Sequence, residues 1–185
     1  ESFSDIQVLR YQVPGWEELT LQQKTLAYYL YEAALAGRDI IYDQLGKHNL
    51  EVRKTIEAIY SHYAGAKSGD EWQAFVTYAG RIWFSNGIHH HYASDKILPE
   101  FTEAYFTELI QNTDASLLPL QEGETKEDLM KRLRPVLLDK NYHAKKVNLK
   151  DGIDNIVGSA NNFYEGVTQK EVEASTNAEN SDKKE

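Results

Sequence analysis

Residues 70–87 read DEWQAFVTYAGRIWFSNG, and this stretch decides the fold class of the chain. Its large apolar residues recur every three or four positions, which is the pattern of a helix with one buried face. Asp70 is a suitable N-cap, and the pair Asn86-Gly87 is typical of a helix end. The residues expected to face a core are Trp72, Phe75, Val76, Ala79, Ile82 and Trp83.

Segments before this helix follow the same pattern. One runs from Thr20, with Gln23 at the capping-box position, to a plausible stop at Gly46. We expect it to be a single helix with one buried apolar stripe. This stripe comprises Leu26, Tyr29, Leu30, Ala33, Gly37, Ile40, Ile41 and Leu45. A second helix is expected at 50–63.

Three more helix starts follow the quoted stretch. Thr102 caps a helix with apolar residues facing inward, and Thr125 begins a short helix that Pro135 should limit. Residues 145–166 are rich in Asn and Gly, so we expect an irregular segment with at most one short strand. A last helical start falls at Thr168.

These elements indicate a mainly α-helical fold, an irregular multi-helix, bundle-like lobe with at most a short strand or two. Residues 1–19 are expected to form an extended lead-in, with a turn at Pro14-Gly15. Residues 20–170 form the helical lobe. Residues 171–185 form a polar tail whose composition favours disorder, because it contains almost no large apolar residue to bury.

The composition is that of an ordinary globular protein. The chain has 185 residues, 41% of them hydrophobic, and a formal net charge of −9. Nucleic-acid binding depends mostly on Lys and Arg that neutralise phosphates, so this charge argues against a nucleic-acid partner. No apolar run approaches the length of a membrane span, and we expect none.

Cysteine is absent from the chain. This excludes disulfides, thiolate metal sites and a cysteine nucleophile, but it does not assign a compartment. The first residue is Glu1 and not Met, which suggests a processed or trimmed amino terminus. The protein could act in the cytoplasm, or in the periplasm after removal of a signal segment.

The run His89-His90-His91-Tyr92 stands out among the polar residues. Consecutive side chains diverge in both strands and helices, so at most His89 and His91 could converge on one metal ion. Three interpretations remain open for this run. They are a metal site, a polar loop with hydrogen-bonded or solvated histidines, and a loop that contacts a peptide ligand.

Other catalytic signatures are missing, including the zinc-protease helix motif, the phosphate loop and the nucleophile elbow. Tyr28, Tyr29 and Tyr31 fall within four residues, so they cannot all face one core. They either pack against several neighbours with their hydroxyl groups at the edge, or they form a face that docks on another lobe.

Five stretches together resemble dipeptidyl peptidase III, and most closely its bacterial members. They are residues 28–38 (YYLYEAALAGR), 70–80 (DEWQAFVTYAG), 84–87 (FSNG), 92–99 (YASDKILP) and 163–168 (FYEGVT). The similarity is to the amino-terminal part of that enzyme and covers about residues 4–174. The stretches occur in the order of the family with similar spacing. None of them is a catalytic motif, so they indicate the family better than a role.

The resemblance implies a two-lobed zinc exopeptidase that removes dipeptides from the amino end of short peptides. In the complete enzyme two His and a Glu bind zinc in one helical lobe, and a further Glu serves as general base. This chain resembles the first part of the other lobe. The resemblance therefore implies that this chain contributes no catalytic residue and no metal ligand, and that its partners are short peptides and the missing zinc-binding lobe.

Four residues are carried over from the resemblance as substrate-binding residues. Tyr92 matches an aromatic residue of the cleft-facing loop and is expected to form a wall of a peptide subsite. His91 is its neighbour, and Asn86 and Gly87 shape the loop.

The zinc motifs of the family are absent from this sequence, and the last residues leave the family's pattern. The chain is therefore expected to be a truncated or excised piece, or a lobe used separately, and to be inactive alone. The alternative is a non-catalytic helical module that binds a peptide or protein through residues 85–99 or through the tyrosine-rich face.

Overall fold

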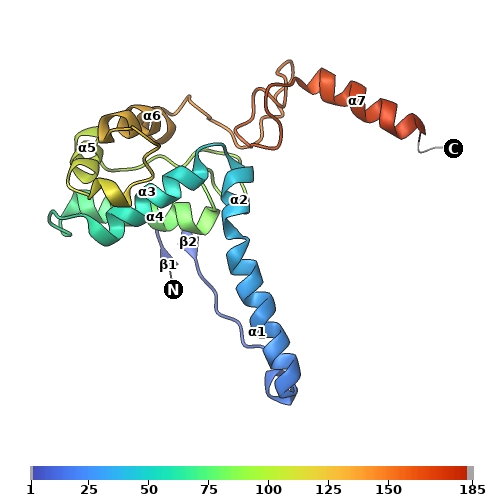
Figure 1. The fold of residues 1–185 in the computed structure, drawn as a ribbon, viewed down its shortest axis with the longest axis horizontal. Helices are drawn as coiled ribbons and strands as arrows, with labels where there is room; N and C mark the ends of the chain where they lie inside the picture. Colours follow the sequence, from blue (N-terminus) through green and yellow to red (C-terminus); the bar gives the residue numbers. More distant parts are fainter. Residues whose placement is uncertain (1, 183–185) are drawn as a thin grey trace. The chain divides into compact units, whose positions relative to one another are not determined.

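The computed structural model describes the backbone of residues 2–182 and the side chains of residues 2–175. The predicted fold class is confirmed, because helices dominate these described residues and the sheet that they contain has two short strands. The chain divides into two compact units, one ending at Ile41 and the other beginning at Tyr42. Each unit is described by itself (Figure 1).

The first unit begins with a small hairpin in which β1 (Ser2–Phe3) pairs antiparallel with β2 (Ile6–Gln7). The expected turn at Pro14-Gly15 is present, since Gly15 has a φ of 84° and precedes a 3-10 turn at Trp16–Glu18. The lead-in predicted for residues 1–19 therefore contains a hairpin and a helical turn. Residue 1 lies outside the described residues.

Helix α1 (Leu21–Ala36) begins at the predicted capping box. The Thr20 hydroxyl accepts from the Gln23 amide at 3.3 Å, and the Gln23 side chain accepts from the Thr20 amide at 2.9 Å. The helix ends at Gly37 and α2 (Arg38–Leu45) follows, so the single helix expected from Thr20 to Gly46 is two helices.

The prediction that α1 carries one buried apolar stripe is wrong. None of the residues of α1, all of which the structure describes, is buried. Leu26, Tyr28, Tyr29, Leu30 and Tyr31 are each 58–65% exposed. These residues occupy almost consecutive positions, so they point in every direction around the helix axis and do not define one face.

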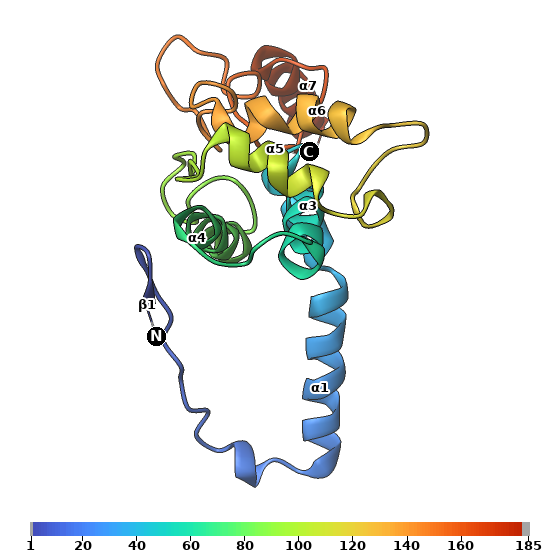
Figure 2. The same ribbon diagram turned by 90° about the vertical axis from the view of Figure 1, so that its left-hand side faces the viewer.

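The second unit contains the core. Its main helices are α3 (Asn49–His62), α4 (Asp70–Ser85), α5 (Glu103–Gln111), α6 (Lys126–Leu138) and α7 (Gln169–Asp182), with a 3-10 turn at Ala115–Leu117. Helix α3 packs against α4, and α5 packs against α6 (Figure 2). Side chains from these four helices meet in one hydrophobic cluster.

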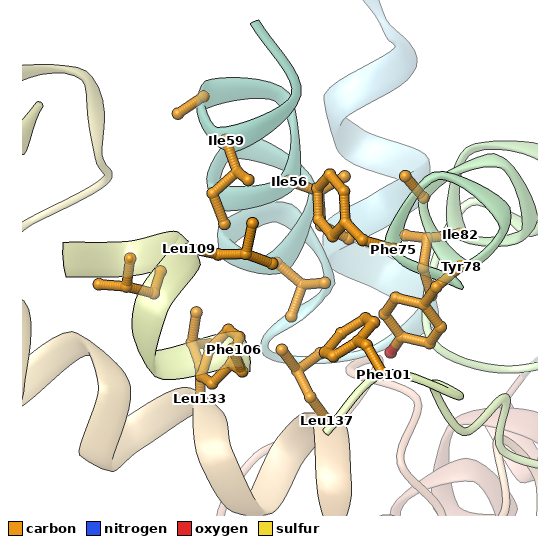
Figure 3. Packing of buried hydrophobic residues seen from close by; sticks show 14 of the residues in the cluster. Ile56, Ile59, Phe75, Tyr78, Ile82, Phe101, Phe106, Leu109, Leu133 and Leu137 are labelled. Atoms are coloured by element: carbon orange, nitrogen blue, oxygen red, sulfur yellow. The ribbon is translucent and has the colours of Figure 1, made fainter. Parts of the chain in front are cut away.

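Figure 3 shows the centre of this cluster. Phe75 from α4 and Leu109 from α5 are at most 1% exposed, and Phe101 lies 6.1 Å from Phe75 between ring centroids. At one edge the Trp72 ring stacks on Tyr63, with a centroid distance of 5.7 Å. The labelled residues are Ile56, Ile59, Phe75, Tyr78, Ile82, Phe101, Phe106, Leu109, Leu133 and Leu137.

Helix α4 covers the stretch that predicted the fold, with two corrections. The N-cap is Gly69, so Asp70 is the first helical residue and not the cap. Val76 and Trp83 are partly buried beside the cluster and not within it. The next carboxylate, Glu71, accepts the amide of Thr102 at 2.9 Å and its hydroxyl at 2.8 Å, which ties α4 to the start of α5.

Pro135 does not limit α6 as expected, because the helix continues to Leu138. A proline inside a helix removes one backbone hydrogen bond. Here Val136 and Leu137 are at most 2% exposed, so burial offsets that loss. The Lys96 ammonium also donates to the Pro135 carbonyl at 3.3 Å.

Beyond α6 the chain is irregular up to α7, as expected, and the possible strand is only an isolated bridge between Asp95 and Lys145.

The tail at 171–185 was predicted to be disordered, but the structure shows a helix there as far as Asp182. Residues 183–185 lie outside the described residues. Reciprocal capping starts this helix, because the Thr168 amide donates to Glu171 at 2.8 Å and the Glu171 amide donates back to the Thr168 hydroxyl.

Across the described residues, no helix combines the length and the apolar character needed to cross a membrane.

Candidate functional site

The candidate loop, residues 86–97, begins where α4 ends. Asn86 adopts a left-handed conformation with φ 53° and ψ 39°, and the Gly87 amide donates to the Ile82 carbonyl at 3.1 Å. Asparagine and glycine tolerate such geometry at a helix end better than other residues. The structure therefore confirms that this pair ends the helix.

A buried asparagine holds the start of the candidate loop. Asn49 is 1% exposed, and its Oδ1 accepts the Ile88 amide at 3.2 Å. A Cβ added at Gly87 would lie 2.2 Å from Asn49 Nδ2, so only glycine leaves room there. Sequence reasoning missed Asn49, because nothing in the sequence pairs an asparagine at one helix start with a glycine 38 positions later.

The three consecutive histidines point to three different surroundings. His89 is 3% exposed, and its Nε2 donates to the His143 carbonyl at 2.7 Å. Burial lowers the pKa of His89 to about 4, so its imidazole is neutral at pH 7. His90 Nδ1 accepts the amides of Tyr92 and Ala93, at 3.2 and 3.0 Å.

His91 is half-buried beside α4. Its ring meets the Phe84 ring edge-on at a centroid distance of 4.9 Å, and the Tyr92 ring lies 4.5 Å away. The structure thus places two of the predicted site residues, His91 and Tyr92, side by side. In the described part of the chain, no group of three His, Cys, Asp or Glu side chains could hold a metal ion.

Tyr92 lies at the tip of the candidate loop. Its side chain is 89% exposed, the highest value among the large hydrophobic side chains of residues 2–175. An exposed phenol ring can offer both an apolar face and a hydroxyl to a ligand. Because so little of the chain packs against it, the backbone of the loop determines where the ring is presented.

Three lysines anchor the candidate loop to the segment that follows α6. Lys96 donates to the carbonyls of Asp139 at 2.6 Å and Tyr142 at 2.8 Å, and burial lowers its pKa to about 8. Lys145 forms an ion pair with Asp95. Lys146 donates to the His90 carbonyl at 3.3 Å. Both the start and the end of the loop are therefore held.

A hollow of about 390 Å³ lies next to this anchoring segment. The ammonium of Lys47 and the carboxylate of Glu165, both in its wall, are 2.6 Å apart. The four predicted site residues are not among those that line it. The lining residues are Lys47, His143, Ile156, Val157, Ser159, Ala160, Asn161, Asn162, Tyr164, Glu165, Gly166, Val167 and Thr168.

No protein-family model matches this chain, and no curated protein matches it at a significant level of similarity. The resemblance to dipeptidyl peptidase III therefore stays a prediction, and so do the roles that it implies for Asn86, Gly87, His91 and Tyr92.

Proposed function

We propose that this chain is the amino-terminal helical part of a dipeptidyl peptidase III-like zinc exopeptidase, and that it contributes Tyr92 and His91 to the wall of the peptide cleft. The observation that carries the proposal is the presentation of Tyr92. Its ring is 89% exposed on a loop whose two ends are held by Asn49 and Lys96. An anchored loop with an exposed aromatic tip is typical of a ligand-contacting segment.

The proposed contribution of this chain is binding and not bond cleavage. Zinc, held by the other lobe, would supply an activated water. The Tyr92 ring would pack against a substrate side chain near the amino end of the peptide, and the edge of His91 would limit the space beside it. Substitutions here should therefore alter KM more than kcat.

Helix α1 supports the proposed zinc-binding lobe as a partner. A helix that is apolar on all sides is usually enclosed by other elements. Leu26, Tyr29 and Leu30 are each at least 60% exposed in the chain as it stands. We propose that the other lobe covers these residues in the complete enzyme.

The decisive experiment joins the chain to the zinc-binding part of a dipeptidyl peptidase III and measures hydrolysis of a dipeptidyl-naphthylamide. Tyr92→Ala should lower kcat/KM about tenfold, mainly through KM, because one aromatic contact is lost. Tyr92→Phe should retain most of the activity. Tyr11→Ala is the matched control, since Tyr11 is 83% exposed and lies outside the candidate loop.

Full activity of the Tyr92→Ala enzyme would contradict the proposed role. The chain without the zinc-binding part should not hydrolyse the substrate. Any hydrolysis by a zinc-loaded sample of the chain alone would contradict the proposal that this chain binds substrate and the other lobe cleaves it.

A non-catalytic binding module remains the second candidate, favoured by the exposed aromatic residues of α1. It predicts that the isolated chain binds short peptides saturably in calorimetry. It also predicts that Tyr29→Ala or Tyr31→Ala weakens this binding more than Tyr92→Ala does. Absence of binding heat across a set of short peptides would dispose of this candidate.

A further inference from the structure

The tip of the candidate loop is shaped by His90, the middle histidine of the run. His90 Nδ1 lies 3.2 Å from the Tyr92 amide nitrogen and 3.0 Å from the Ala93 amide nitrogen. We propose that His90 is a positioning residue, and that this double acceptor contact presents Tyr92 to the peptide. The inference rests on the proposed function for its consequence in substrate binding.

The hydrogen bonds assign one chemical form to the His90 ring. A ring nitrogen that accepts a hydrogen bond carries no proton, so the single proton of the neutral imidazole lies on Nε2. A side-chain acceptor that binds the amides two and three positions ahead replaces the backbone contacts of an ordinary turn, as Asn and Asp do in Asx turns. His90 therefore folds the tip of the loop locally.

The neighbouring contacts do not substitute for this acceptor. His89 bonds to the His143 carbonyl in the interior, and the His91 ring packs against Phe84. Lys146 reaches the carbonyls of His90 and His91, which are acceptors and not the two amides in question. His90 Nδ1 is the acceptor that the structure gives to the amides of Tyr92 and Ala93.

Loss of the acceptor should affect Tyr92 more than the rest of the loop. The Tyr92 ring is 89% exposed, so packing contributes little to its orientation. Its position then depends on the backbone turn, and a looser turn would have to be ordered when the peptide binds. That ordering cost would weaken binding without changing the chemical step.

The first test is amide hydrogen exchange in the full 185-residue chain. His90→Ala and His90→Phe should speed exchange at residues 92 and 93 about tenfold, because both variants remove the acceptor and the Phe variant keeps a ring. His90→Asn should retain slow exchange, since its Oδ1 lies at the same position along the side chain as Nδ1. His62→Ala is the matched control, because His62 is exposed on α3. Unchanged exchange at both amides in His90→Ala would overturn the inference.

The second test is a double-mutant cycle in the same joined enzyme. His90→Ala should raise KM severalfold with kcat nearly unchanged, whereas His90→Asn should keep KM near that of the unmodified enzyme. In the double variant, His90→Ala should not raise KM beyond the value of Tyr92→Ala alone. Additive effects would show that His90 acts independently of Tyr92 and would overturn the inference. If Tyr92→Ala alone had no effect, the proposed function would fail, and the exchange result would still decide whether His90 holds the turn.

Discussion

Helices α1 and α4 have the same length of 16 residues and both are rich in apolar side chains, yet they have opposite surroundings. Helix α4 buries six residues, among them Trp72, Phe75 and Ile82, whereas no residue of α1 is buried. The apolar residues of α4 recur at three and four positions. Those of α1 are almost consecutive between Leu26 and Tyr31.

This contrast shows that apolar content does not select a buried face. A helix packs in its own unit when its apolar side chains share one side, as in α4. When they surround the helix, as in α1, one neighbouring layer cannot cover them all. Such a helix needs several elements around it, which agrees with the proposed second lobe and predicts that the two helices contribute very differently to stability.

The largest difference is expected from truncating one aromatic residue in each helix. Phe75→Ala in α4 should lower the free energy of unfolding by about 3–5 kcal/mol, because it opens a cavity in the core. Tyr29→Ala in α1 should change it by less than about 0.5 kcal/mol, because the ring is 65% exposed. Urea unfolding followed by circular dichroism measures both. Equal effects would contradict the contrast between the helices.

The two glycines after these helices provide the second comparison. Gly87→Ala should lower the free energy of unfolding by about 2–4 kcal/mol, because the new Cβ would meet Asn49 at 2.2 Å in a backbone with φ 149°. Gly37→Ala, after α1, meets only ordinary contacts at 3.7 Å and should be neutral or slightly stabilising. A tolerated Gly87→Ala would show that Asn49 does not hold the start of the candidate loop tightly.

Lowering the pH should lower the stability of the unit that contains α4, because that unit buries His89. The pKa of this buried imidazole is lowered to about 4, compared with about 6.5 in an unfolded chain. The unfolded state therefore binds a proton between these values that the folded state does not, so stability falls as the pH falls from 6.5. The loss should reach about 2 kcal/mol by pH 5.

His89→Gln is the matching variant for this pH effect. It should flatten the dependence of the unfolding free energy between pH 6.5 and 5, a range above that in which carboxylates mainly titrate. An unchanged slope in His89→Gln would assign the acid sensitivity to other groups, such as His143, whose pKa burial also lowers.

The smallest effect is expected at the helix caps. Thr102→Ala removes the cap of α5 and the hydroxyl bond to Glu71 of α4, and it should cost about 1 kcal/mol of unfolding free energy. Thr20→Ala removes the cap of α1. Because α1 has no buried residue, this variant should reduce the helix content of α1 with little change in the unfolding free energy of the chain. A global loss from Thr20→Ala as large as that from Thr102→Ala would mean that α1 is coupled to the core.

Much of the fold could be predicted where the local signals agree. The capping residues Thr20, Thr102 and Thr125 and the helix end at Asn86-Gly87 were identified because capping depends on nearby residues. The failures came from tertiary context. Pro135 was expected to stop its helix, but the helix continues to Leu138 because burial of Val136 and Leu137 offsets the lost hydrogen bond.

The candidate site was predictable only in part. The sequence indicated the polar loop, and the resemblance to dipeptidyl peptidase III implied the contact by Tyr92; the structure shows that Tyr92 is exposed. The sequence could not indicate Asn49 or His90, because the first acts across 39 residues on the Ile88 amide and the second through a turn that depends on side-chain geometry. Contacts of this kind leave no spacing pattern.

The aromatic stack around Trp72 has an optical consequence. The chain has three tryptophans; Trp72 lies 5.7 Å from Tyr63 in the core of the second unit, Trp83 meets Tyr60 edge-on nearby, and Trp16 is 40% exposed in the first unit. In a Trp16→Phe chain all remaining indole emission would originate beside the core. Unfolding of the second unit could then be followed by its own tryptophan fluorescence, without attaching a dye.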